Sequence, residues 1–387
     1  MSIIIDPGKS RVAVIRCEDY DYPSVKRAVQ RGIELIGGCQ ELIQPGDKIL
    51  LKPNLLAPDP PEKCVTTHPA VFKAVAEVLQ AAGAVLSYGD SPALGSCERA
   101  ARKAGIMAAA EELGLAMADF RHGEETAFLA GVQNKKFVVA RGVLACDGIV
   151  SLPKLKTHGL TRLTGAIKNQ FGCIPGMLKG EFHVKLPRVE DFARMLVDLN
   201  LLLRPRLFVM DGIMAMEGNG PRGGKARQMG VLLFSTDPVA LDATVCRLVN
   251  LRPEEILTLK YGQEMGLGTH CSENIELVGD ALGSMIRLDF ETGHNSAAAN
   301  LGSPWLRNQI AARPVIDTPK CIKCGICVQM CPVKPPAVHW RDDERLIPPL
   351  YDYDRCIRCY CCQEMCPEGI ITLHTPWLGR LLSPFHV

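Results

Sequence analysis

The sequence contains few aromatic residues and has no marked excess of charge of either sign. Phe, Trp and Tyr make up 5% of the 387 residues, and 44 Lys and Arg against 42 Asp and Glu leave a formal net charge of +2. A globally basic nucleic-acid-binding protein is therefore excluded. The sequence lacks a run of the ~18 apolar residues that a membrane-spanning helix needs, and its first residues lack the pattern of a signal peptide. We expect no nucleic-acid partner and no transmembrane segment.

Familiar catalytic motifs are also missing. The sequence has no phosphate loop of the form G-x-x-x-x-G-K-[ST], no G-x-S-x-G elbow and no H-E-x-x-H helix. We interpret the glycine-rich string 218–224 as neither a phosphate loop nor a dinucleotide-binding turn. Nothing in the sequence therefore supports a nicotinamide site or a P-loop ATP site.

Cysteine, in contrast, is abundant, with 17 residues, of which nine lie between Cys321 and Cys366. The spacing C-x2-C-x2-C-x3-C-P occurs twice there, and this spacing holds 4Fe–4S clusters in which the fourth cysteine of each run ligates the other cluster. We therefore predict two 4Fe–4S clusters, one bound by Cys321, Cys324, Cys327 and Cys366, and the other bound by Cys356, Cys359, Cys362 and Cys331.

Zinc and disulfides are the alternatives for these cysteines. Zinc uses separated C-x2-C pairs and needs no third cysteine followed by Cys-Pro, so two complete copies of the run favour iron–sulfur clusters. Cys361 fills a variable position, and we interpret it as a bystander, although its place beside Cys362 permits ligand exchange. Clusters and unpaired thiols are typical of a reducing compartment, so we expect a cytoplasmic protein.

The first ~280 residues alternate apolar runs with helical periods, which predicts an α/β fold with a mostly parallel sheet covered by helices. We expect an α/β domain over 1–283, a linker over 284–314, a small α+β ferredoxin-like domain over 315–373, and a tail over 374–387 that packs back on the body. The expected strands are 12–15, 48–51, 84–87, 148–152, 206–210, 231–234 and 275–278. The expected helices are 24–42, 69–82, 98–113, 161–171, 188–203, 238–249 and 253–265.

Five polar strings follow predicted strands, and in open α/β sheets ligands bind at the carboxyl ends of strands. We therefore predict one site assembled from several loops. Its predicted catalytic residues are His158, Lys156 and Glu217, with His158 as the proton donor because imidazole titrates near neutral pH. Its predicted substrate-binding residues are Lys52, Asn54, Asp90, Ser91, Lys154, Lys168, Asn169 and Asn219.

Charge favours an anionic substrate at this site. Segment 151–188 holds seven Lys and Arg and one acid, Glu181, while the chain as a whole is nearly neutral. A solvated basic face is an equally good interpretation of the segment. Loop stabilisation is an alternative for Lys52 and Asn54, and helix or turn capping is the alternative for Asp211 and Asp237.

These strings together resemble a known family. Lys52-Pro-Asn54, Gly89-Asp-Ser-Pro92, Pro153-Lys-Leu-Lys156-Thr-His158 and Thr236-Asp-Pro238, among others, are similar to domain of unknown function 362, whose members often carry a C-terminal two-cluster ferredoxin. The resemblance covers roughly 48–249 and 315–373, and Cys361 is an extra cysteine within it. It implies the fold and the clusters but no substrate. A more distant likeness, to the nickel-pincer lactate racemase group, is a fold analogy only.

Three functions are compatible with the sequence. The first is a ferredoxin-fused reductase that passes electrons from an external donor of ferredoxin or flavodoxin type, through the clusters, to a small anionic substrate. The second is an electron-transfer or cofactor-delivery protein without a catalytic site of its own. The third is a non-redox enzyme with structural or sensory clusters. We favour the first, because fusion holds an electron relay at high effective concentration beside the site.

Overall fold

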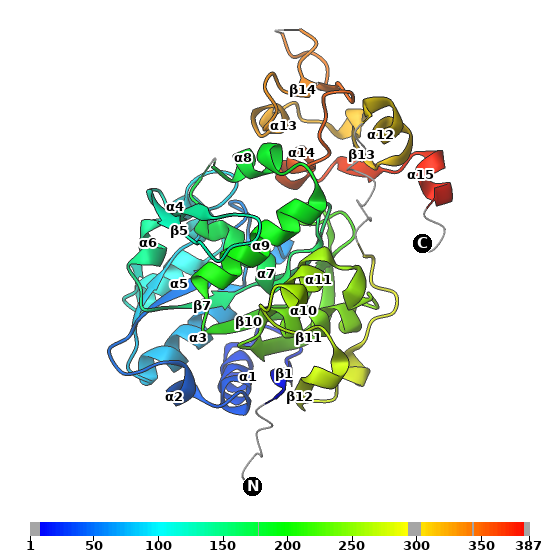
Figure 1. Ribbon diagram of the computed structural model, residues 1–387. Helices are drawn as coiled ribbons and strands as arrows, with labels where there is room; N and C mark the ends of the chain where they lie inside the picture. Colours follow the sequence, from blue (N-terminus) through cyan, green and yellow to red (C-terminus); the bar gives the residue numbers. More distant parts are fainter. Residues whose placement is uncertain (1–7, 177, 293–302, 343, 383–387) are drawn as a thin grey trace.

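The computed structural model describes residues 8–176, 178–292, 303–342 and 344–382. A large α/β body occupies the first 290 residues, and a small C-terminal module sits at one end of its sheet (Figure 1). Part of the predicted linker, 293–302, and the last part of the predicted tail, 383–387, lie outside the described residues. None of the described helices is both long and apolar enough to cross a bilayer.

The body is built on a ten-stranded sheet whose main path runs β12-β1-β11-β10-β7-β2-β3-β4. Only β11 runs antiparallel to its neighbours on this path, so the predicted mostly parallel α/β sheet is confirmed. The strands are β1 (Ser10–Arg16), β2 (Lys48–Pro53), β3 (Val85–Tyr88), β4 (Ala116–Met117), β7 (Gly148–Leu152), β8 (Lys154–His158), β9 (Arg162–Leu163), β10 (Leu207–Glu217), β11 (Lys225–Ser235) and β12 (Ile275–Gly279), and a separate hairpin is formed by β5 (Gly123–Ala127) and β6 (Lys136–Ala140).

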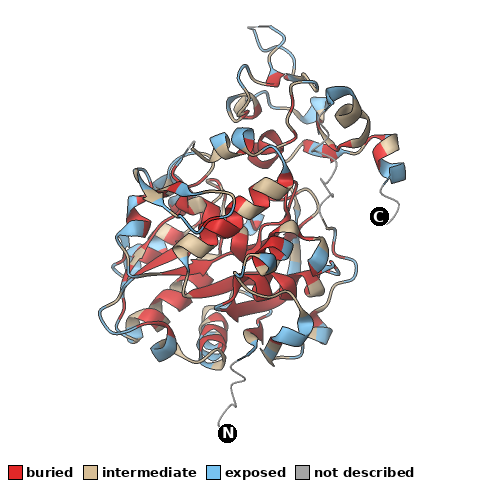
Figure 2. Cartoon of the chain, viewed as in Figure 1, coloured by how far each residue is buried: buried red, intermediate tan, exposed pale blue. Residues whose placement is uncertain are grey.

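Helices cover both faces of the sheet and leave an apolar core on each side, as the buried central strands in Figure 2 show. Alternate strand residues enter the two cores, because successive side chains of a strand point to opposite faces. One face carries α1 (Tyr22–Leu35), α2 (Cys39–Leu42), α3 (Pro69–Ala81), α4 (Cys97–Lys103) and α5 (Ile106–Glu112). The other carries α6 (Arg141–Leu144), α7 (Gly165–Asn169), α8 (Leu178–Lys185), α9 (Val189–Leu203), α10 (Pro238–Leu248) and α11 (Leu257–Glu264).

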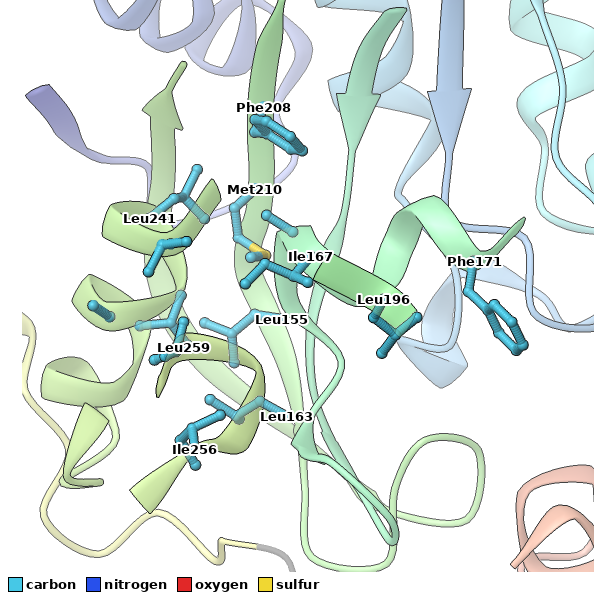
Figure 3. Packing of buried hydrophobic residues seen from close by; sticks show 14 of the residues in the cluster. Leu155, Leu163, Ile167, Phe171, Leu196, Phe208, Met210, Leu241, Ile256 and Leu259 are labelled. Carbon is cyan, nitrogen blue, oxygen red and sulfur yellow. The ribbon is translucent and has the colours of Figure 1, made fainter. Parts of the chain in front are cut away.

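The second core holds the helices that carry part of the site. Figure 3 shows Met210 of β10 beside Leu241 of α10 and Ile167 of α7, all within one cluster of buried residues. The start of α10 is fixed by Asp237, whose Oδ1 accepts hydrogen bonds from the amides of Val239 and Ala240 at 2.8 and 3.0 Å. Asp237 therefore has the capping role that was the alternative to catalysis.

The structure differs from the sequence expectations at several elements. The predicted helix 161–171 becomes helical only from Gly165, because Arg162 has φ of +64° and lies in strand β9. The predicted helix 253–265 is divided into a 3-10 turn over Pro253–Glu255 and helix α11. The predicted helix 24–42 is divided at Gly37 and Gly38, which have φ of +121° and +85°, and the predicted helix 98–113 is divided at Gly105 with φ of +76°. The polar segment after β7, expected as a loop, is the buried strand β8, which pairs with β10 and β9.

The module contains two short two-stranded sheets and several short helices, as expected for a small α+β domain. Its elements are α12 (Pro304–Ile310), β13 (Arg313–Ile316), α13 (Ile326–Gln329), β14 (Val338–His339), β15 (Leu350–Tyr351), α14 (Cys361–Met365), β16 (Ile371–His374) and α15 (Trp377–Leu382). Strand β13 pairs with β16, and β14 pairs with β15.

Two segments outside the predicted ferredoxin-like domain belong to this module. Helix α12 lies in the predicted linker range, yet Asn308 donates to Asp354 Oδ1 at 2.6 Å and Arg307 donates to the Asp354 carbonyl at 2.8 Å. Helix α15 of the predicted tail packs against α12, with Gly379 placed against the Ile310 carbonyl. The described part of the tail therefore packs within the module.

Candidate functional site

A cavity of about 450 Å³ lies where the module meets the carboxyl ends of the central strands. This is the end of an α/β sheet at which ligands bind. The wall includes seven of the predicted catalytic and substrate-binding residues, which are Asn54, Asp90, Ser91, Lys156, His158, Lys168 and Asn169. It also includes Lys179 and His183 of α8, and Cys331, Cys361 and Glu364 of the module. Lys52, Lys154, Glu217 and Asn219 are not part of this wall.

A buried polar network anchors the floor of the cavity. Lys52, which is fully buried, donates to Asp90 Oδ1 at 2.8 Å, and Asp90 Oδ2 accepts the Leu55 amide at 2.7 Å. Asn169 Oδ1 accepts from Asn54 Nδ2 at 3.0 Å. These residues follow β2 and β3 or end α7, so the network joins three chain segments. Lys52 lies beneath the wall and acts as the loop stabiliser that was its alternative interpretation.

Lys156 projects from β8 into the cavity with little access to water. Its Nζ donates to Asn54 Oδ1 at 2.7 Å and to the Val65 carbonyl at 2.6 Å. Burial, together with the neighbouring Lys168 and Lys154 ammonium groups, lowers the pKa of Lys156 to about 7. An amine that titrates near neutral pH can both give and take a proton, so Lys156 suits general acid–base chemistry.

His158 lies two residues further along β8 and faces the module. Its Nδ1 accepts the amides of Leu160 and Thr161 at 3.0 and 3.4 Å, so the neutral ring carries its proton on Nε2. That nitrogen lies 3.0 Å from Glu364 Oε1, but the two atoms are not aligned for a hydrogen bond and neither has another partner within the described residues. Two buried polar atoms with incomplete partners therefore meet at the cavity wall.

Charge at this wall is set by burial. Burial lowers the pKa of His158, although Glu364 opposes the effect, so the imidazole is neutral at pH 7. Burial alone would raise the pKa of Glu364, but His158 and Lys168 lower it to about 2. Glu364 is therefore a carboxylate, supplied by the module to a site that is otherwise basic.

Lys168 and Lys179 bring further positive charge to the cavity. Lys179 donates to the Ser91 carbonyl and Oγ and to the Ile174 carbonyl at 2.8 to 3.0 Å, and burial lowers its pKa to about 7. Lys168 is half-buried and lies over the Phe171 ring at 5.7 Å. Within the described part of the chain its ammonium donates to no acceptor, so it remains available to a ligand.

Lys154 belongs to a second polar network, at the first residue of β8. Its Nζ donates to Asp211 Oδ2 and to Tyr20 OH, both at 2.8 Å, and Asp211 Oδ2 accepts the His68 amide at 2.9 Å. The His68 ring stacks on Tyr20 with centroids 3.5 Å apart. This network fixes the loop before α3, so Asp211 and Lys154 hold the backbone in place rather than line the cavity.

Asn219 lies in the glycine-rich string, which contacts the module, and Glu217 directly precedes the string at the end of β10. Asn219 Nδ2 donates to the carbonyls of Gly369 and Ile371 at 3.0 and 2.9 Å, while Glu217 Oε2 accepts the Glu291 amide at 3.1 Å. Arg222 donates through Nε to Asp59 at 2.7 Å and through Nη1 to the Met365 carbonyl at 2.7 Å. We name residues 218–224 the docking loop.

The docking loop does contain G-x-G-x-x-G spacing at Gly218, Gly220 and Gly223, directly after β10. A dinucleotide site also needs a helix N-terminus after the glycines, which binds the pyrophosphate. Here strand β11 follows instead. The glycines permit close backbone contact, since a Cβ on Gly223 would lie 2.6 Å from the Gly369 Cα. The loop therefore serves contact between the domains.

The eight predicted cluster cysteines surround two separate hollows in the module. The outer set, Cys321, Cys324, Cys327 and Cys366, lines one hollow, and the inner set, Cys331, Cys356, Cys359 and Cys362, lines the other. Each hollow thus has the four thiols that a 4Fe–4S cluster takes as ligands, three from one cysteine run and the fourth from the other run. Within the described residues no three His, Cys, Asp or Glu side chains are placed to share a single metal ion.

The inner set adjoins the cavity between the domains. Cys331 lines both its own hollow and the cavity, and Cys361 lines the cavity without lining either hollow. Cys324 of the outer set is exposed. One set of cysteines therefore faces the candidate substrate site, and the other reaches the surface.

Sequence reasoning did not assign four residues of the site. Lys179 and His183 lie in the basic segment 151–188, which was the signal for them. The roles of Glu364 and Arg222 could not be predicted, because a charged residue in a ferredoxin repeat or a glycine-rich loop does not indicate a partner more than 140 residues away.

Comparisons with known proteins agree with this division. Residues 49–247 match the family described as domain of unknown function (DUF362), and residues 320–370 match the 4Fe-4S dicluster domain. A thylakoid-associated protein of Synechocystis is 34% identical over 263 residues, which span 68% of this chain and 81% of that protein.

Similarity to solved structures is more distant. The lactate racemase apoprotein from Thermoanaerobacterium thermosaccharolyticum is 12% identical with a TM-score of 0.38 over 61% of this chain, and a protein from Thermotoga maritima is 12% identical with a TM-score of 0.32 over 52%. The matched regions span 56% and 53% of those two chains, just over half of each.

Proposed function

The chain belongs to the DUF362 family and carries a 4Fe-4S dicluster domain, and from this premise we propose that it is a ferredoxin-fused reductase. Two 4Fe–4S clusters would pass electrons to an anionic small molecule held in the cavity between the domains. The observation that carries the proposal is the composition of the cavity wall. Cysteines of the module and basic residues of the body face the same space of about 450 Å³, a size typical of small-molecule sites.

The proposed electron path follows the order of the two cysteine sets. When bound, the clusters supply electrons one at a time. Cys324 of the outer set is exposed, which suits contact with an external donor of ferredoxin or flavodoxin type. Cys331 of the inner set lies in the cavity wall, which suits delivery to a substrate. An oxygen-poor, reducing compartment such as the cytoplasm fits a chain whose 17 cysteines are all free thiols.

The residues of the body would bind the substrate and supply protons. Lys168 offers an ammonium that no described residue satisfies, so it would hold the anionic group. Lys156 and His158 lie in the same wall. Lys156 would serve as the proton donor, and the neutral His158 would offer its Nε2–H to the substrate as a hydrogen-bond donor. Asn54, Asp90, Ser91 and Asn169 would position these groups through the network beneath them.

Anaerobic stopped-flow spectroscopy tests the proposal on the full chain. The clusters would be reconstituted, reduced chemically and mixed with small anions, including conjugated carboxylates and phosphorylated metabolites, while their absorbance is followed. We expect at least one compound to reoxidise the clusters faster than buffer does, and Lys168→Met to slow that reaction. Lys136→Met, which alters an exposed lysine of β6 paired with Glu125, is the matched control. If no compound accelerates reoxidation, the reductase proposal fails and a pure electron-carrier role is favoured.

A further inference from the structure

We propose that the cavity is built for a monoanionic carboxylic acid with an apolar, conjugated body. This inference rests on the reductase function proposed above and names its class of substrate. It is carried by three features of the wall, which are the number of free charges, the apolar area that surrounds them, and the position of Cys331.

The charges of the wall leave room for one anionic group. Lys179 donates to three protein acceptors and Lys156 to two, so their ammonium groups are mostly occupied, and Lys185 is paired with Glu181 at 2.8 Å. Within the described wall, Lys168 is the remaining interior ammonium, and Lys334 is exposed at the rim. A ligand with one negative charge matches this count.

Phosphate-rich ligands fit the wall poorly. Such ligands are usually held by several cations or by the free amides of a helix N-terminus. The first amides of α7 are already occupied, because Asp242 accepts from Ala166 and Ile167 at 2.6 and 3.1 Å. The carboxylate of Glu364 also faces the cavity and would repel each additional negative charge.

The rest of the wall is apolar. Leu55, Leu56, Phe171, Val184, Met330 and Met365 contribute to it from both domains. Apolar side chains around a few placed polar groups are typical of sites for small organic molecules rather than for ions. The body of the ligand is therefore apolar, and only one end of it needs to reach Lys168.

Conjugation follows from the way electrons would arrive. A cluster held in part by Cys331 would deliver electrons one at a time. The substrate must therefore be able to delocalise an unpaired electron, which a saturated acid cannot do. For a carbon–carbon double bond conjugated with an aryl group, two electrons and two protons convert C=C to CH–CH. When held by the two cysteine sets, the clusters would supply one electron each, and an external donor of ferredoxin or flavodoxin type would reduce them again. Lys156 would pass on the protons, which come from water that enters the cavity.

Isothermal titration calorimetry on the full, cluster-loaded chain tests the ligand class. The probes are cinnamate, 4-hydroxycinnamate and 2-naphthoate, with 3-phenylpropanoate as the unconjugated acid and pyrophosphate as the polyanion. We expect at least one conjugated acid to bind below millimolar concentration and to bind about 10-fold more weakly to Lys168→Met. Its affinity for Lys136→Met should equal that for the unaltered chain, since that lysine is remote and exposed.

Reoxidation kinetics with the same probes separates this inference from the function beneath it. Conjugated acids should bind and reoxidise the clusters, whereas 3-phenylpropanoate should bind without reoxidising them. If binding depends on Lys168 but is never followed by reoxidation, the proposed ligand class stands and the reductase function is refuted. Tighter binding of pyrophosphate than of every acid, or binding indifferent to Lys168→Met, would overturn the ligand class.

Discussion

Replacing Arg222 with methionine should loosen the module from the body, because one buried guanidinium joins the two. Its Nε and Nη2 donate to the two carboxylate oxygens of Asp59 at 2.7 and 3.2 Å, and its Nη1 donates to the Met365 carbonyl at 2.7 Å. Arg222 is 8% exposed and Asp59 is 3% exposed. Water therefore cannot replace the lost donors without a movement of the docking loop.

The size of the effect follows from the charge left behind. Removing one partner of a buried ion pair costs about 3–5 kcal/mol, mostly because the other charge stays buried. Lys63 Nζ lies 3.6 Å from Asp59 Oδ1 and is half exposed, so it compensates part of that charge. We therefore expect a loss near the lower limit, about 3 kcal/mol. Adding Asp59→Asn removes the stranded charge and leaves mainly the lost hydrogen bond to Met365, about 1 kcal/mol.

Urea unfolding of the full chain, followed by circular dichroism under anaerobic conditions, measures both changes. The double variant Asp59→Asn, Arg222→Met should be more stable than Arg222→Met alone by about 2 kcal/mol. Hydrogen exchange at the amides of α14 should rise in the single variant and partly recover in the double. Arg31→Met, which breaks only a surface pair with Asp280, should cost less than about 1 kcal/mol. A double variant no more stable than the single one would refute the reasoning.

Three further predictions follow from the same contacts. Cys361→Ala should keep the iron content unchanged, whereas Cys331→Ala should lower it by about half, since only Cys331 is a predicted ligand; equal losses in iron analysis would argue that Cys361 is also a ligand. Burial lowers the pKa of Lys168 from the ordinary lysine value of 10.5. Conjugated acids should therefore bind more weakly as pH rises, with the midpoint of the loss below pH 10.5, because only the ammonium attracts a carboxylate. Calorimetry at several pH values checks this, and pH-independent binding would contradict it. Gly223→Ala should destabilise the docked module by about 1–3 kcal/mol in urea unfolding, because the added Cβ would meet the Gly369 Cα at 2.6 Å; an unchanged midpoint would show that the contact can yield.

The sequence located the main strands because their apolar runs are local signals. Each of the seven expected strands has a counterpart among β1, β2, β3, β7, β10, β11 and β12. Strand β8 was not predicted, because its lysines and histidine are typical of a loop. Their acceptors are Asn54, Val65 and Asp211, which come from elements distant in sequence. A strand with buried cations is stable only when such acceptors are in place, and local sequence cannot show them.

The candidate site could be predicted in position more readily than in composition. Strand ends converge at one edge of the sheet, so Asn54, Asp90, Lys156 and Lys168 were expected to meet, and all four line the cavity. Which side chains on one strand face reach the cavity depends on the partners that packing places beside them. Lys154, two residues before Lys156, is drawn to Asp211 instead. The sequence also could not show that about a quarter of the lining residues come from the module.

The glycine-rich string illustrates why a motif alone could not settle its role. A loop that binds phosphate and a loop that binds another stretch of backbone both need small residues and free amides, because both bring main chain close to an acceptor. The following element decides between them, and here it is β11 rather than a helix. The docking loop accordingly holds the backbone of the module, at Gly369 and Ile371.

Helix α14 links this docking to the proposed chemistry. Three consecutive residues of it each contact the body, since Gln363 donates to Asn219 Oδ1 at 2.8 Å, Glu364 lies 3.0 Å from His158 Nε2, and the Met365 carbonyl accepts from Arg222. The same short helix contains Cys362 and is followed by Cys366, one predicted ligand from each set. Any movement that opens the cavity must therefore also move the cysteines. Because the cavity belongs to neither domain alone, substrate binding and electron delivery both depend on the docked state.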